Sequence, residues 1–90
     1  MKKLWYVYIL SCADGSLYTG VTVDLDRRIA QHDAGTGARY TRSHGPVKLV
    51  FFEEAESRSA AQVREAAIKK LGRVEKEVLI ATSKNITSVS

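Results

Sequence analysis

The sequence predicts an α+β domain with a small three-stranded antiparallel sheet flanked by about three helices. Two short runs rich in Val, Ile, Tyr and Trp, within residues 5–22, flank the turn signal Ala13-Asp14-Gly15 and predict a β-hairpin. A third, mostly apolar run follows at 47–54, and helical periodicity with capping signals occupies much of the remaining chain. These three observations set the fold class.

The length of the hairpin loop decides which tyrosines share a face of the sheet. A two-residue turn would place Tyr18 on the opposite face from Tyr8. A three-residue loop at 13–15, with glycine at its third, left-handed position, pairs Tyr8 with Gly20 instead. We favour the three-residue loop because glycine occupies that position at no steric cost. Tyr8 and Tyr18 are then diagonal neighbours on one face, roughly 7–8 Å apart at the backbone.

The segment after the hairpin predicts the first helix. Asp24 is expected to cap it, and the helix runs to about Ala34 before Gly35 closes it. Leu25 and Ile29 are its apolar positions and define the face that is directed toward the core.

A third strand and a second helix follow. The mostly continuous apolar run at 47–54 indicates a central strand that is covered on both faces. The capping-box pattern at 59–62 indicates that the second helix begins there and runs to Leu71 before Gly72.

A third, shorter helix is expected from about Arg73 to Ala81. Its apolar side is expected to comprise Val74 and Val78, with either Leu79 or Ala81.

Length and composition bound the class of protein. The 90 residues, 44% apolar and 27% charged, describe a domain at 1–82 followed by a polar tail at 83–90 that is expected to be disordered. No apolar run approaches the roughly 18 residues of a membrane span, so no membrane association is expected. The lone Cys12 excludes an intramolecular disulfide and a cysteine-based zinc site, and it fits a reducing cytoplasm. A net charge of +4 is by itself only a weak indication of a polyanionic partner.

The tyrosines of the hairpin allow two interpretations. Aromatic side chains in strands usually pack, and packing suffices to explain Trp5 and Tyr6. Tyr8 and Tyr18 differ because Gly20 leaves open space opposite Tyr8, and such a position often marks close approach of a ligand or another backbone. The hairpin alone leaves both interpretations open.

Arg28 and His32 lie on the expected core-facing stripe of the first helix. Polar groups directed there are costly unless they are paired or in contact with a site. Either one alone could lie at the edge of the stripe and reach water. Together, one turn apart and just after the tyrosine hairpin, they indicate a site. Arg27 is the neighbouring alternative, but its direction does not suit the same face.

A glycine-punctuated loop at 35–46 carries Arg39, Tyr40, Arg42 and His44. Loops of this length in small domains are usually functional or mobile. Cations interleaved with an aromatic ring suit contact with phosphates and stacking on bases or sugars. The alternative is a solvated surface loop with ordinary charges.

The triplets Tyr6-Val7-Tyr8 and Tyr18-Thr19-Gly20, ten residues apart, and the helix after them resemble the GIY-YIG nuclease superfamily. The resemblance is strongest to its small single-domain bacterial, UPF0213-like type, and it covers about residues 4–82. Members place an arginine eight residues after the glycine of the second triplet, and several place a histidine four residues later. Arg28 and His32 match both positions. The stretch GARYTR at 37–42 matches a similar GAKYTR stretch of this type.

The resemblance changes the interpretation of Glu65. From the residues alone, Glu65 lies beside the apolar stripe of the second helix, and an exposed i, i+4 pair with Lys69 is favoured. In the family's REAxIKKL pattern, matched here at 64–71, this glutamate binds a single catalytic metal. The implied cofactor is Mg²⁺ or Mn²⁺. Mg²⁺ can be bound by one carboxylate together with retained waters and a substrate phosphate.

The chemistry that the resemblance implies is metal-assisted hydrolysis of a phosphodiester. Glu65 would hold the metal and Arg28 would donate to phosphate oxygens. Tyr8 or Tyr18 would deprotonate the attacking water, with His32 as a relay or alternative base. We favour Tyr8 as the base and Tyr18 as its orienting partner. Because the ordinary pKa of tyrosine is about 10, the base needs a nearby guanidinium, a metal-bound water or transfer of its proton to His32.

The leading functional hypothesis is a Mg²⁺-dependent DNA endonuclease, structure-directed or weakly sequence-specific, with a role in DNA repair. Gly20, Arg39, Tyr40 and Arg42 are the expected nucleic-acid contacts, RNA stays an open alternative to DNA, and a protein partner would supply specificity. The competing hypotheses are a non-catalytic nucleic-acid-binding module that uses the same groove, and a small interaction domain whose tyrosines are core. One departure from the family is that the asparagine that many members carry after the start of the third helix has no good match, since the only Asn is Asn85.

Overall fold

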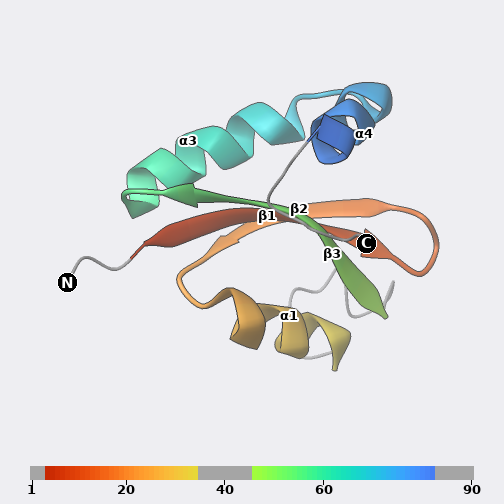
Figure 1. Ribbon diagram of the computed structural model, residues 1–90, viewed down its shortest axis with the longest axis horizontal. Helices are drawn as coiled ribbons and strands as arrows, with labels where there is room; N and C mark the ends of the chain where they lie inside the picture. Colours follow the sequence, from red (N-terminus) through yellow and green to blue (C-terminus); the bar gives the residue numbers. More distant parts are fainter. Residues whose placement is uncertain (1–3, 35–45, 83–90) are drawn as a thin grey trace.

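Three antiparallel strands form a sheet with helices on both of its faces (Figure 1). The computed structural model describes residues 4–34 and 46–82. The strands are β1 (Trp5–Cys12), β2 (Leu17–Thr22) and β3 (Val47–Ala55), in the order β2-β1-β3. Helix α1 (Leu25–Asp33) lies on one face of the sheet; α3 (Arg58–Lys69) lies on the other and leads into α4 (Arg73–Thr82). The predicted α+β class with three strands and three helices is confirmed.

The hairpin of β1 and β2 has the predicted three-residue loop. Tyr8 pairs with Gly20, and Leu10 pairs with Tyr18. Gly15 has a φ of +88°, and its N–H donates to the Cys12 carbonyl at 2.9 Å, which closes the turn. Tyr8 and Tyr18 therefore lie on the same face of the sheet, as the candidate site requires.

The expectation that the third strand is central is wrong. In the described sheet β3 pairs with β1 alone, and β1 is the middle strand, where the run Val7–Leu10 is entirely buried. The apolar run of β3 has another cause, because its two faces pack on different partners. Phe51 enters the core, whereas the Phe52 ring meets the Tyr6 ring edge-on, with centroids 6.2 Å apart.

Helix α1 begins as predicted, whereas α3 begins earlier than expected. The Asp24 carboxylate accepts a hydrogen bond from the Arg27 N–H at 3.1 Å and caps α1. The cap of α3 is Ser57, two residues before the predicted start, and its hydroxyl accepts from the Ala60 N–H at 3.1 Å. The helix ends at Lys69 rather than Leu71. The capping-box pattern indicated Ser59, but the serine two residues upstream caps the helix.

The main core lies between the sheet and α3. Its buried members come from β1, β3 and α3 and are Val7, Ile9, Phe51, Ala61 and Ile68. Helix α4 adds Leu79 and Ile80 at the edge of this cluster. The expected apolar side of α4 is therefore wrong for Val74 and Val78, whose side chains are 71% and 56% exposed. Within the described residues, no helix has the length and apolar character needed to cross a membrane.

Candidate active site

The missing side chain at Gly20 makes room for the Tyr8 phenol. A Cβ added at Gly20 would lie 2.6 Å from the Tyr8 Oη and 2.8 Å from its Cζ. It would also lie 3.2 Å from the Tyr18 Cε2. The close approach that the sequence indicated at Gly20 is thus made by a phenol of the same chain. A nucleic-acid contact at Gly20 stays a prediction.

Tyr8 and His32 form a buried hydrogen-bonded pair between β1 and α1. The Tyr8 Oη and the His32 Nε2 are 2.9 Å apart, and the two residues are only 1% and 0% exposed. The Tyr18 ring lies beside both rings, with centroids 5.2 Å from His32 and 6.4 Å from Tyr8. His32 therefore does not snorkel to water, and the three rings form one cluster on the α1 face of the sheet.

Side chains from three elements act on the Tyr8 hydroxyl. Burial raises the pKa of Tyr8, while the adjacent Arg28 guanidinium of α1 lowers it. The Tyr18 hydroxyl of β2 and the Glu65 carboxylate of α3 each raise the same pKa. Glu65 therefore lies within electrostatic reach of the Tyr8 hydroxyl. Side chains of β2, α1 and α3 therefore all influence this hydroxyl of β1.

His32 is held in its neutral form. Burial lowers the pKa of its imidazole, and the positive charge of Arg28 lowers it further. A neutral imidazole has one ring nitrogen that can accept a proton, so its hydrogen bond to Tyr8 provides a path along which a proton can move. The geometry can therefore support transfer between a phenol and an imidazole out of contact with bulk water.

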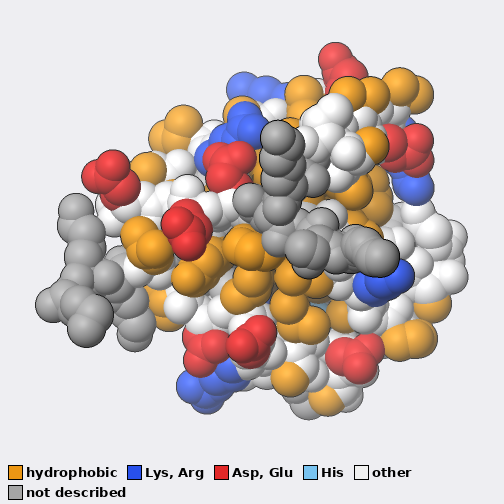
Figure 2. Space-filling model, in the orientation of Figure 1, with side chains coloured by type: hydrophobic (Ala, Val, Ile, Leu, Met, Phe, Trp, Pro, Cys, Tyr) orange, Lys and Arg blue, Asp and Glu red, His pale blue; other side chains and the backbone are white. Residues whose placement is uncertain are grey.

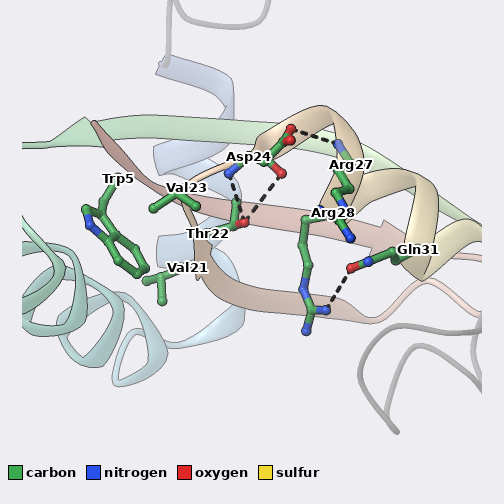
Figure 3. Close-up of a pocket in the computed structure, with 8 residues that line it drawn as sticks. All are labelled: Trp5, Val21, Thr22, Val23, Asp24, Arg27, Arg28 and Gln31. Atoms are coloured by element: carbon green, nitrogen blue, oxygen red, sulfur yellow. Dashed lines mark hydrogen bonds between the residues drawn. The ribbon is translucent and has the colours of Figure 1, made fainter. Parts of the chain in front are cut away.

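Arg28 points from the buried cluster toward an open groove. Its guanidinium donates to the Gln31 Oε1 at 3.1 Å and lines a groove of about 360 Å³ (Figure 3). Arg28 is half-buried, whereas the neighbouring Arg27 is exposed. This difference agrees with the choice of Arg28 over Arg27 from helical direction.

The expected i, i+4 pair of Glu65 is present, and binding of a metal by Glu65 stays a prediction. Its carboxylate pairs with the Lys69 ammonium at 3.2 Å, as an i, i+4 pair would. The Glu65 side chain is nevertheless only 21% exposed, compared with 55% for Lys69. It therefore lies half-turned toward the sheet and within electrostatic reach of Tyr8.

The chain matches the family model described as the GIY-YIG catalytic domain over residues 4–77. It belongs to the GIY-YIG family. Within the family it is similar to UPF0213 proteins, and it is 58% identical to one from Natronomonas pharaonis over 84% of this chain and 89% of that protein. A second UPF0213 protein, from Clostridium perfringens, is also 58% identical, over 86% of this chain and 83% of its own length.

Solved structures of this group have the same fold. The solution NMR structure of the UPF0213 protein BH0048 from Bacillus halodurans superposes with a TM-score of 0.60. It is 46% identical and covers 92% of this chain and 88% of its own. The resemblance that the two triplets indicated is therefore confirmed for family and fold. The names of these relatives assign no reaction.

The donor set of this GIY-YIG domain fits a hard cation bound by one protein carboxylate. Among residues 4–34 and 46–82, no three His, Cys, Asp or Glu side chains gather in a way that could hold a metal. Mg²⁺ and similar ions can be held by a single carboxylate together with waters and substrate phosphates. Glu65, half-buried and within electrostatic reach of Tyr8, is the residue that would do so, and its ion pair with Lys69 would then have to open.

Three predicted nucleic-acid contacts of this GIY-YIG chain, Arg39, Tyr40 and Arg42, lie outside the described residues, as does Asn85. Sequence reasoning missed the groove beside Arg28, which includes Trp5 and Gln31. Gln31 follows Arg28 by one helical turn, and that spacing could have indicated a partner for the guanidinium. Nothing in the local sequence relates Trp5 to α1.

Proposed function

We propose that this GIY-YIG domain is a Mg²⁺- or Mn²⁺-dependent endonuclease that hydrolyses phosphodiester bonds in DNA. The observation that carries the proposal is the 2.9 Å hydrogen bond between the Tyr8 Oη and the His32 Nε2, with Arg28 and Glu65 acting on the same hydroxyl. Packing alone does not require an imidazole and a second phenol beside Tyr8, or a guanidinium and a carboxylate within electrostatic reach of it. Hydrolysis of a phosphodiester uses a proton acceptor, a cation for the phosphate and a carboxylate for a metal.

Tyr8 and His32 act as one proton acceptor in this proposal. As the Tyr8 oxygen takes a proton from the attacking water, its own proton passes to the His32 Nε2. The transfer avoids a free tyrosinate, which burial disfavours by raising the pKa of Tyr8. The lowered pKa of His32 keeps its imidazole neutral and ready to accept at neutral pH.

Tyr18 and Arg28 position the substrate. Tyr18 is the more exposed of the two phenols, so we place the approach of water and phosphate on its side. Arg28 would donate to non-bridging phosphate oxygens through its planar fork. It also lies beside the Tyr8 hydroxyl, so a phosphate held by Arg28 lies near the proton acceptor.

Glu65 is the proposed metal-binding residue. A bound Mg²⁺ or Mn²⁺ would offset negative charge on the phosphate and on the departing oxygen. The Glu65 carboxylate, on α3, raises the pKa of Tyr8, and this electrostatic reach supports the assignment.

The proposed substrate is DNA in damaged or branched form, consistent with a repair role in the cytoplasm. The residues of the loop, Arg39, Tyr40 and Arg42, are proposed to add phosphate and stacking contacts, with a protein partner supplying specificity. Figure 2 shows acidic and basic side chains interspersed around a band of apolar atoms on one face. This mixture and the net charge of +4 favour local contacts over long-range attraction of a polyanion.

Nicking of a supercoiled plasmid in the presence of Mg²⁺ tests the proposal. Wild-type protein is expected to nick, whereas Tyr8→Phe and Glu65→Gln are expected to be at least about 100-fold slower. Tyr6→Phe and Glu77→Gln are matched controls, because Tyr6 packs on Phe52 and Glu77 forms an i, i+4 pair with Arg73 away from the site. Both controls are expected to nick at the wild-type rate. Equal nicking by all five proteins, or none by wild type, would reject the enzyme.

A binding module without turnover is the second candidate. The 1% exposure of Tyr8 favours it, because a base must meet water. Such a module would bind DNA with a salt dependence that reports its phosphate contacts, and it would leave the plasmid intact. Binding without nicking would therefore select the module.

A further inference from the structure

The groove beside Arg28 lies where α1 faces the ends of β1 and β2. It is lined by one residue of β1, the end of β2 with the connection to α1, and one side of α1: Trp5, Val21, Thr22, Val23, Asp24, Arg27, Arg28 and Gln31. Figure 3 shows Trp5 and Val21 at one end and Arg28 with Gln31 at the other. Its volume of about 360 Å³ falls within the range typical of small-ligand sites.

The two ends of the groove differ in chemistry. Trp5 and Val21 form an apolar end, and the Arg58 guanidinium carbon lies 6.0 Å from the centre of the Trp5 ring. Arg27 and Arg28 bring positive charge to the other end. The one lining carboxylate, Asp24, accepts from the Arg27 N–H in the cap of α1. An anionic group joined to a flat apolar ring complements this arrangement.

Arg28 connects the groove to the proposed reaction centre. The same guanidinium lines the groove and lowers the pKa of Tyr8. A phosphate on Arg28 would therefore stand at the reaction centre, with the rest of its nucleotide directed along the groove toward Trp5.

We propose that this groove is a nucleotide subsite. It takes the nucleotide next to the phosphate that is cleaved, with its base or sugar against Trp5 and Val21. The inference rests on the proposed function and narrows its substrate class. A base paired inside a duplex cannot enter a groove on the protein, so the preferred substrate has an unpaired nucleotide beside the scissile phosphate.

Fluorescence of Trp5, the single tryptophan of the chain, tests the subsite without requiring cleavage. The full chain is titrated, with EDTA present, with a short oligothymidylate and with an abasic strand of equal length and charge. The oligothymidylate is expected to change the emission of Trp5, and the abasic strand is expected to change it far less. Equal changes with both strands, or no change with either at saturation of binding, would overturn the subsite.

Substitution of Trp5 separates base contact from phosphate contact. Trp5→Leu is expected to weaken binding of the oligothymidylate about tenfold while leaving binding of the abasic strand unchanged. Trp5→Phe, which keeps a ring, is expected to retain most of the affinity, and Val78→Leu on the exposed side of α4 serves as a control. A Trp5→Leu protein that melts cooperatively and loses affinity for both strands equally would contradict the subsite.

The failure of the subsite and the failure of the proposed enzyme give different results. Emission changes that are specific to the base, without plasmid nicking, would leave the subsite standing and reject the enzyme. Plasmid nicking without a base-specific change in Trp5 emission would reject the subsite and leave the enzyme standing.

Discussion

At Gly20 the absence of a side chain decides where a phenol on the next strand can lie. The Tyr8 ring occupies the space over Gly20, and from there its hydroxyl reaches the His32 Nε2. The glycine is thus a requirement of packing between two strands, and the hydrogen bond of the candidate site depends on it.

Gly20→Ala is expected to lower the free energy of unfolding by about 1–3 kcal/mol, because a Cβ cannot stay 2.6 Å from the Tyr8 Oη. It should also disturb the Tyr8–His32 hydrogen bond and slow any nicking. Urea unfolding measures the first effect. Gly72→Ala is the control, since a Cβ there meets only the Glu75 Oε1, at 3.5 Å, and should cost less than about 1 kcal/mol. Equal losses in the two variants would contradict the packing argument.

The buried His32 makes stability depend on pH. Because burial lowers the pKa of His32 below its ordinary value of about 6.5, the unfolded chain binds more protons than the folded protein between the two pKa values. The contribution of His32 to the free energy of unfolding is therefore fully present above about pH 6.5. It decreases as the pH is lowered through that value and becomes constant below the pKa of His32 in the folded protein.

Unfolding free energies measured in urea at about pH 7.5 and about pH 5.5 test this assignment. The loss of stability on acidification is expected to be smaller in His32→Gln than in wild type, whatever the absolute stability of the variant. The same loss in both proteins would show that other groups cause it.

Individual site residues were predictable where a rule of local geometry applied. The loop length put Tyr8 and Tyr18 on one face, and helical direction selected Arg28 over Arg27. The hydrogen bond between Tyr8 and His32 was not predictable from spacing, because it depends on how closely α1 approaches the sheet.

At the scale of single elements, helix α3 shows how a repeated local signal misleads. Ser57 and Ser59 are both exposed serines at the start of the helix, and only Ser57 accepts from a backbone N–H of the first turn. The sequence pattern selected Ser59 because a glutamine follows it three residues later. Capping depends on the backbone angles of one residue, and Ser57 has the extended conformation that a cap requires.

Ser57→Ala is expected to lower the free energy of unfolding by about 1 kcal/mol, because it leaves the Ala60 N–H without its acceptor. Ser59→Ala should change it by less than about 0.5 kcal/mol. Thermal unfolding of the two variants side by side distinguishes them. A larger effect of Ser59→Ala would restore the cap that the sequence pattern indicated.

The sequence predicted that the strands and the last helix exist, but not which elements they pack against. An apolar run such as 47–54 does not reveal whether its strand is central or at an edge, since helices and rings can cover an edge strand too. Similarly, Val74 and Val78 are spaced as an apolar helical stripe, but the orientation of α4 turns Leu79 and Ile80 to the core instead.

At the scale of the whole molecule, one core fixes both the fold and the position of Glu65. Ile68, one turn after Glu65 on α3, is completely buried against the sheet. Packing of Ile68 and Ala61 therefore sets the rotation of α3 and with it the direction of the carboxylate.

Ile68→Ala is expected to lower the free energy of unfolding by about 2–5 kcal/mol, which is a large share of the stability of a domain of this size. Val63→Ala on the same helix, at a position 71% exposed, should change it by less than about 0.5 kcal/mol. Denaturant titration followed by circular dichroism measures both. Comparable values for the two would contradict the assignment of the core.

The burial of Tyr8 and His32 bears on how relatives of this chain should be compared. Both are among its largest fully buried side chains, so selection for folding alone would preserve them even in a relative without catalytic activity. Tyr18, Arg28 and Glu65 are less buried and owe less to packing. Their retention or loss across the family is therefore the better indication of which lineages could carry out the proposed reaction.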